Sequence, residues 1–137
     1  MRKLALFIAL TSMAALTSCT KEEVKPEAPK FYLTYRASAT YAAIKVDDYV
    51  RKSQVFAFYG SYTYTTEVSD LDSATVGIYS SAANGLNQDV SLMVDLNGIV
   101  LVNETFKKVN GIGEEYTLDL KAAKAQWLAA PKKKGGK

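Results

Sequence analysis

Hydrophobic and polar residues alternate along most of the chain from residue 31 onward. The run that begins there places Phe31, Leu33, Tyr35 and Ala37 on one face, which predicts a strand with that face buried. Further β-like runs follow at 42–46, 54–60, 62–68, 74–80 and 114–120. Strands and turns that repeat every roughly 8 to 12 residues are typical of an antiparallel sandwich or small barrel and not of a βαβ fold.

The clearest local unit is a hairpin centred on Asn97 and Gly98. An Asn-Gly pair between two alternating runs is a strong hairpin signal, because both central residues of a type I′ turn need a positive φ. The cross-strand pairs that this turn predicts are Leu96 with Ile99, Val94 with Leu101, and Leu92 with Asn103. One face of the hairpin is then apolar and is expected to face the core; its residues are Val90, Leu92, Val94, Leu96, Ile99 and Leu101.

The pattern changes to a helical one near the end of the chain. The alanine-rich stretch 121–131 favours a short helix, with Asp119 as a candidate N-cap and Pro131 as its end. One stripe at helical spacing is apolar and consists of Leu120, Ala123, Trp127 and Ala130. The basic residues 132–137 are expected to be disordered.

The N-terminus has the layout of a secretory signal. Arg2 and Lys3 precede a short apolar run that is too brief to span a bilayer as a helix, which takes roughly 20 residues. The residues Leu16-Thr17-Ser18-Cys19 resemble a bacterial lipobox, which implies cleavage of residues 1–18 and lipidation of Cys19. Two or more acyl chains hold a protein firmly on a bilayer. The alternative is an ordinary signal peptide with an incidental cysteine.

Residues 19–30 are predicted to form the lipidated N-terminus and a flexible linker. They are rich in charge and contain two prolines, so they have little to bury, and when extended they could lift a domain by roughly 35 Å. Lys21, Glu22 and Glu23 resemble the surface-export signal of Bacteroidota lipoproteins. This resemblance implies an outer-membrane protein anchored by its lipid, at the cell surface; the periplasmic face, with these charges acting only as a solvated tether, is the alternative.

Composition removes several kinds of chemistry. The chain has no histidine and one cysteine, which excludes hydrolytic triads and the common zinc sites. Between the signal segment and the C-terminal lysines, acidic side chains outnumber basic ones, which argues against a nucleic-acid partner. The lysine tail could attract lipid phosphates, or it could be a solvated terminus or an expression remnant.

Carboxylates remain as candidate ligands or catalysts. Asp47 and Asp48 adjoin in one turn, and Asp70 and Asp72 flank another. Calcium needs six to eight oxygen ligands, and the spacing of an EF-hand is missing, so ordinary turn carboxylates are expected. A glycosidase would need two opposed carboxyl groups over a groove. We therefore expect no catalytic residue, no metal, no cofactor and no enzymatic activity.

Tyrosine is concentrated in the first half of the domain. Tyr32, Tyr59, Tyr62 and Tyr64 could present their rings on one exposed sheet face, and such faces bind sugars or partner proteins. The alternative is that tyrosine simply suits half-buried strands.

A stretch of about 90 residues resembles small β-sandwich lipoproteins of Bacteroidota, related in pattern to the mycobacterial MmpS-type accessory domain. The residues that carry the resemblance are the turn 94–98, the glycine-bearing loop 109–113, the strand residues Tyr116-Thr117-Leu118 and the opening segment 31–46. The resemblance implies an Ig-like sandwich of about seven strands over 31–120. The sequence departs from the pattern after Leu120, where the helix and the lysine tail are additional.

Together these features predict a non-enzymatic, lipid-anchored lipoprotein of the cell envelope that acts as an interaction or accessory module. Its partners would be the membrane, through the N-terminal lipid, and an envelope protein or glycan. The alternatives are a glycan-binding module on the tyrosine face, an accessory subunit of an envelope transporter, and a hydrolase with an unsuspected carboxylate pair.

Overall fold

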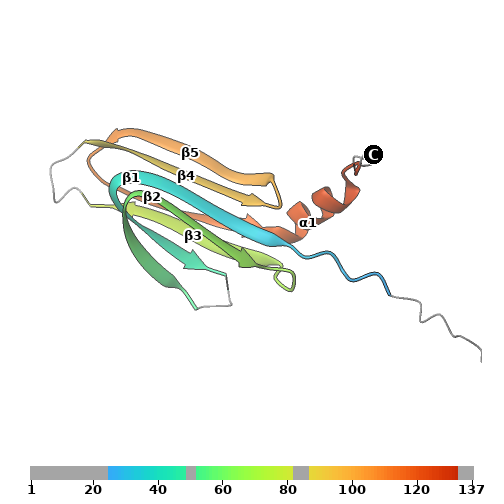
Figure 1. Ribbon diagram of the computed structural model, residues 1–137. Coiled ribbons are helices and arrows are strands. Elements are labelled where there is room, and N and C mark those ends of the chain that lie inside the picture. Colours follow the sequence, from blue (N-terminus) through green and yellow to red (C-terminus); the bar gives the residue numbers. More distant parts are fainter. Residues whose placement is uncertain (1–24, 49–51, 82–86, 133–137) are drawn as a thin grey trace, which may run out of the picture.

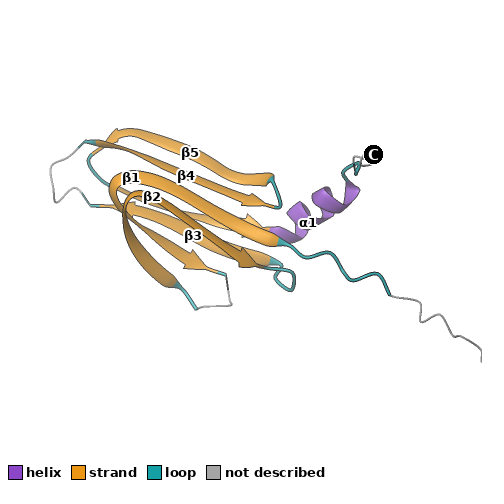
Figure 2. Cartoon of the chain, in the orientation of Figure 1, coloured by secondary structure: helices purple, strands orange, loops and turns teal. Residues whose placement is uncertain are grey.

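The computed structural model describes residues 25–48, 52–81 and 87–132. Within these ranges the chain is mostly antiparallel β-structure with one short helix at the C-terminal end (Figures 1 and 2). The elements are β1 (Tyr32–Asp47), β2 (Gln54–Glu67), β3 (Ser73–Ser80), β4 (Gln88–Leu96), β5 (Ile99–Val109), β6 (Ile112–Asp119) and α1 (Leu120–Ala129).

Strand β1 organises the whole sheet. One edge of β1 pairs with β2 along nearly its full length. The other edge is divided, because β4 pairs with residues 33–38 and β3 pairs with residues 43–47. The strand order is β5-β4-β1-β3-β6, with β2 on the remaining edge of β1. The sheet therefore continues in two directions from the two halves of one strand, and it curls (Figure 1).

A β-bulge produces the bend in β1. The register between β1 and β2 shifts between Ala39 and Ala42, and Gly60, the partner of Ala39, has a φ of 78°. A bulge bends its strand, and glycine adopts a positive φ without steric cost. The bend turns the two halves of β1, and the strands attached to them, toward a common interior.

That interior is the hydrophobic core. The predicted inward face of the first strand is confirmed, because Phe31, Leu33, Tyr35 and Ala37 are at most 5% exposed. The other strands contribute alternate residues in the same way, as the period-two pattern predicts. Every buried apolar side chain of the described residues lies between Phe31 and Ala123.

The expected seven-stranded sandwich needs correction. The described residues form six strands, because the runs 31–39 and 42–46 join into β1 and the runs 54–60 and 62–68 join into β2. Each junction is a sharp bend within one continuous strand, at which the ribbons of β1 and β2 arch over (Figure 1). All six strands belong to one hydrogen-bonded, curled sheet, and they do not divide into two separate sheets.

The β4–β5 hairpin confirms its predicted turn but not its predicted register. Asn97 and Gly98 both have positive φ, and Leu96 faces Ile99. A bulge between Val94 and Asp95 then shifts the pairing by one residue. The pairs beyond the bulge are Val94 with Val102, Met93 with Asn103, and Leu92 with Glu104, so the predicted partners of Val94 and Leu92 were wrong.

The predicted helix is present and closes one end of the sheet. Asp119 is its N-cap, and its carboxylate accepts a hydrogen bond of 2.9 Å from the Ala122 N–H. Leu120 and Ala123 are buried, whereas the end of the stripe, Ala130, is exposed. Helix α1 follows β6 directly, and it lies where the N-terminal segment leaves the sheet (Figure 1).

Candidate functional site

The residues of the predicted anchor lie outside the described ranges. These are Cys19 and the candidate export residues Lys21, Glu22 and Glu23. The description begins at Lys25, and residues 25–30 are exposed and form no strand or helix. Among the described residues, no helix combines the length and the apolar character that a membrane span requires.

The four candidate binding-face tyrosines do not come together on one exposed surface. Tyr62 and Tyr64 are half-buried on the inner face of β2 and pack against the core. The Tyr64 ring stacks on Tyr35 with centroids 5.8 Å apart, and the Tyr62 ring lies 5.8 Å from Phe56.

Tyr32 and Tyr59 are exposed, but they are separated along the sheet. Tyr32 is 42% exposed and pairs with Glu67 at the start of β1. Tyr59 is 78% exposed, lies next to the bulge and packs its ring 4.8 Å from Tyr41. The arrangement therefore fits tyrosines that suit half-buried strands better than a continuous aromatic face.

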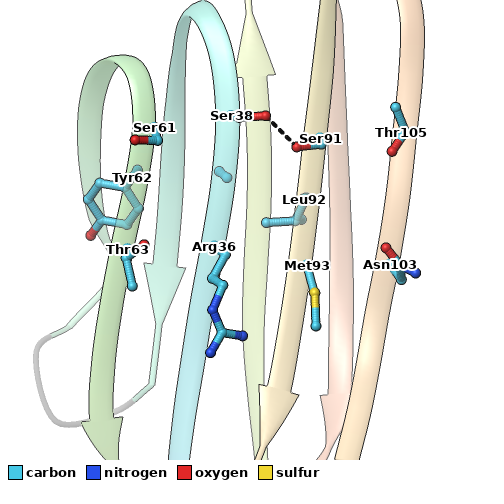
Figure 3. Close-up of a pocket in the computed structure, with 11 residues that line it drawn as sticks. Arg36, Ser38, Ser61, Tyr62, Thr63, Ser91, Leu92, Met93, Asn103 and Thr105 are labelled. Carbon is cyan, nitrogen blue, oxygen red and sulfur yellow. Dashed lines mark hydrogen bonds between the residues drawn. The ribbon is translucent and has the colours of Figure 1, made fainter. Parts of the chain in front are cut away.

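The outer face of the sheet instead carries a shallow polar trough of about 460 Å³. It crosses four neighbouring strands in the order β2, β1, β4 and β5 (Figure 3). One row of hydroxyl side chains runs across these strands and consists of Ser61, Ser38, Ser91 and Thr105, each opposite the next in the strand register. The adjacent row consists of Thr63, Arg36, Met93 and Asn103.

Contacts across the trough fix some of its side chains. The Ser38 and Ser91 hydroxyl oxygens are 2.6 Å apart, which orients both hydroxyl groups (Figure 3). The Arg36 guanidinium donates to the Asp95 carboxylate, which also accepts a hydrogen bond of 3.0 Å from the Gly98 N–H. Because Asp95 is buried and Arg36 is half exposed, the pair holds the guanidinium at the edge of the trough.

The trough offers hydrogen bonds and one cation, and Ala37, Tyr62, Leu92 and Met93 add apolar area to its lining. Its lining residues among those described include no carboxylate, so the trough itself has no acid–base pair for hydrolysis. Its chemistry suits recognition of a partner surface that carries both polar and apolar groups.

Sequence reasoning did not identify the trough. Its residues appear in the sequence as ordinary outward positions of separate strands. Only the pairing of Arg36 with Met93 and of Ser38 with Ser91, across more than fifty residues of chain, brings them together. The one available signal was that Ser and Thr, and not Lys or Glu, occupy the outward positions of residues 61–65.

The candidate carboxylates are dispersed. Asp70 and Asp72 lie in the turn between β2 and β3, and Asp47 ends β1. Asp48 is only 1% exposed, and its carboxylate lies 3.5 Å from the Tyr64 hydroxyl. In the described part of the chain, no three acidic, histidine or cysteine side chains are grouped so that they could hold a metal ion.

Titration in the interior centres on Tyr35. Its hydroxyl is buried without a hydrogen-bond partner among the described residues. Burial raises the pKa of Tyr35 far above its usual value, and the charge of Asp48 raises it further. Tyr35 is therefore neutral throughout the pH range in which the protein would function.

Three outer-face side chains form a group in which two pKa values shift in opposite directions: Lys45 on β1, Tyr79 on β3 and Glu115 on β6. The Tyr79 hydroxyl donates to Glu115 at 2.9 Å, and the Lys45 ammonium lies 3.3 Å from the same carboxylate. These two hydrogen bonds lower the pKa of Glu115, first through Tyr79 and then through Lys45. The pKa of Tyr79 is raised by desolvation and by its bond to Glu115. The group joins β1, β3 and β6 through their side chains.

Comparison with known proteins gives no match: no family model, no curated protein and no solved structure is similar to the chain at a significant level.

Proposed function

We propose that the protein is a non-enzymatic lipoprotein of the bacterial envelope, held on the outer membrane through Cys19, with the β-domain acting as an interaction or accessory module. The observation that carries the proposal is the sequence Leu16-Thr17-Ser18-Cys19 directly behind a short apolar run, in a chain with no other cysteine. The Cys19 thiol has no disulfide partner within the chain. Its position behind the apolar run is that of a lipidated cysteine in a lipoprotein signal.

The organisation of the chain supports this proposal. Residues 25–30 are exposed and belong to no strand or helix, and among the described residues the core begins at Phe31. A lipid at Cys19 would thus be joined to the domain through residues 25–30, which take no part in its core. Such a segment suits a tether, because its conformation is not required for the fold.

The polar trough is the contact surface that we assign to this module. It lies on the outer side of the sheet and needs no unfolding or loop opening to be reached. Arg36 and Asn103 can donate hydrogen bonds, and the hydroxyl row can donate or accept them. A partner with exposed carbonyl or hydroxyl groups, such as an envelope protein, fits this chemistry. The glycan alternative rested on an exposed tyrosine cluster, which positions 32, 59, 62 and 64 do not form.

Lipidation is tested by metabolic labelling with an alkyne fatty acid, in cells that express the wild type or Cys19→Ser. We expect label in the wild type alone and retention of the wild type in the outer-membrane fraction. Because the Cys19→Ser chain keeps the signal segment, its export can be checked separately. A wild-type protein that is exported, cleaved and unlabelled would overturn the proposal.

Surface display is tested by protease treatment of intact cells, comparing the wild type with a variant in which Lys21, Glu22 and Glu23 are changed to alanine. Cleavage of the wild type and protection of the variant would support an export role for the three residues. Protection of both, with normal cleavage after lysis, would place the domain on the periplasmic side. A variant with Lys25 and Glu27 changed to alanine controls for loss of charge in the linker.

A further inference from the structure

The first core residue of the domain is in direct contact with helix α1. The rings of Phe31 and Trp127 meet edge to face, with centroids 5.4 Å apart. The Lys124 ammonium lies 5.6 Å from the centroid of the same phenylalanine ring. The N-terminal segment therefore leaves the domain beside α1, and Figure 1 shows both at one end of the molecule. Residues 25–30 thus leave the domain at the end that carries α1.

The chain from Leu120 onward is strongly basic. Its sequence contains six lysines and no acidic residue: Lys121, Lys124, Lys132, Lys133, Lys134 and Lys137. The Lys124 ammonium is bound to the main-chain oxygens of Ser69 and Leu71, so it serves the fold.

Lys121 and Lys132, by contrast, are exposed. The turn that contains Asp70 and Asp72 contacts α1 through main-chain oxygens: Asp72 O accepts from the first two N–H groups of the helix, and Ser69 O and Leu71 O accept from Lys124.

The second half of α1 also exposes apolar surface. Leu128 is 52% exposed, and the buried residues of α1 are Leu120 and Ala123, both in its first half. Trp127, next to it, is half-buried, and the Lys132 ammonium lies 5.6 Å from its ring centroid. Tryptophan favours the boundary between water and lipid, and lysine can extend from such a boundary toward phosphate groups.

We infer that the end of the domain formed by α1 and Lys132 is a membrane-docking surface, and that it binds the anionic headgroups of the bilayer to which the tether leads. The inference rests on the proposed lipid anchor for its setting, but its chemistry is carried by α1 and Lys132. Lysines supply the attraction to phosphate, and Leu128 with Trp127 supplies a small apolar contact. The polar trough lies on the outer face of the sheet, and its lining includes no residue of α1.

The test uses a chain that starts at Thr20, which keeps every described element and every buried core residue but has no lipid. Phosphatidylcholine vesicles with and without phosphatidylglycerol are titrated into it, and binding is measured by co-sedimentation. Trp127 is the only tryptophan in the protein, so its emission reports on α1 specifically. We expect binding and a blue shift with the anionic vesicles, and loss of both at high salt.

Variants locate the contact. Changing Lys121 and Lys132 to glutamine should weaken vesicle binding about 25-fold, at about fivefold for each lysine near an anionic surface. Leu128→Ser should reduce the blue shift. Changing Lys107 and Lys108 to glutamine is the matched control. These residues lie near the far end of β5, whereas the β4–β5 turn contacts Lys30 at the end of the domain that carries α1. The control should bind like the wild type.

Each contrary result is specific. Equal losses in both lysine pairs would mean a general charge effect, and binding without a change in Trp127 emission would mean another surface; either overturns the inference. A blue shift with inorganic phosphate alone would indicate a small-anion site and would also overturn it. Failure of Cys19 labelling, with vesicle binding intact, would overturn the anchor proposal but not this surface, so the two failures are distinguishable.

Discussion

Asn97 shows how one side chain can direct the start of a domain. Its positive φ allows the tight turn between β4 and β5. Its side-chain oxygen accepts a hydrogen bond of 2.8 Å from the Tyr32 N–H, and its side-chain nitrogen donates one of 3.0 Å to Lys30 O. These bonds join the turn to residues more than sixty positions earlier, so the exit direction of the N-terminal segment depends on the hairpin.

Tyr35 gives a prediction at the same scale. Because its pKa is raised on folding, its contribution to stability is present in full below the ordinary tyrosine pKa of 10.0 and falls as pH rises above it. Its hydroxyl is also buried without a partner among the described residues, which costs about 1–3 kcal/mol for such a group. Tyr35→Phe should therefore leave the unfolding free energy unchanged or raise it by about 1 kcal/mol at neutral pH, and should flatten its decline above pH 10.

Urea unfolding at a series of pH values measures both effects. Tyr59→Phe is the control, because Tyr59 is 78% exposed and lies outside the core. A Tyr35→Phe protein that loses more than about 1 kcal/mol would show that the hydroxyl makes a hydrogen bond of its own.

At the scale of elements, α1 is the clearest case in which local chemistry determines structure. The cap at Asp119, the buried Leu120 and Ala123, and the end near Pro131 all follow from residues within one short stretch. The main-chain oxygen of Asp72 accepts from both Leu120 N–H and Lys121 N–H. The first turn is therefore satisfied from two sides.

Asp119→Ala should lower the unfolding free energy by about 1 kcal/mol, because it removes the acceptor for the Ala122 N–H. Asp119→Ser keeps a capping oxygen and should recover most of that loss. The measurement is chemical denaturation followed by circular dichroism. If the serine variant were no more stable than the alanine variant, capping would not be the role of Asp119.

The strands show which elements the sequence could and could not predict. Alternation identified the inner face from Phe31 to Ala37, because every second residue there is apolar and buried. The register of β4 on β5 could not be predicted beyond Asp95, because the bulge there shifts the pairing by one residue. No local sequence signal marks such a bulge; packing against the rest of the core determines it. The bend between Ala39 and Ala42 was missed for the same reason, since no proline or turn sequence marks it.

The candidate functional residues show the same difference between local and long-range features. The anchor at Cys19 depends on contiguous residues, so the sequence could suggest it. The trough depends on pairing between β1 and distant β4, which long-range packing decides. The four tyrosines do not form one cluster, because alternation along β2 places Tyr59 on the outer face and Tyr62 and Tyr64 on the inner face.

At the scale of the whole molecule, stability should be graded from β1 outward. Strand β1 is paired on both edges, whereas β2, β5 and β6 are each paired on one edge in the described sheet. Backbone groups that face solvent on an edge exchange without global unfolding, and central ones do not. We expect the amides of Leu33–Ser38 to show opening free energies close to the global unfolding value, and those of β6 to show lower ones.

Native-state hydrogen exchange measured by NMR tests this order, with urea unfolding as the reference for the global value. Amides of β4, which also has two neighbours, serve as an internal control and should behave like β1. If β1 exchanged as fast as β6, the described pairing on both of its edges would be contradicted.

The division of β1 between two groups of strands has a mechanical consequence. The N-terminal segment enters the domain at this strand, where the Phe31 and Tyr32 carbonyls accept from Val68 N–H and Asn97 N–H. A force applied through that segment pulls along the strand axis and loads the hydrogen bonds to β2 and β4 in shear, so many must break together. A segment attached to a peripheral strand would instead peel its bonds one at a time. When force acts on the N-terminal segment, from flow or from a moving partner, it therefore acts on β1, the strand with the greatest resistance to being pulled out of the sheet.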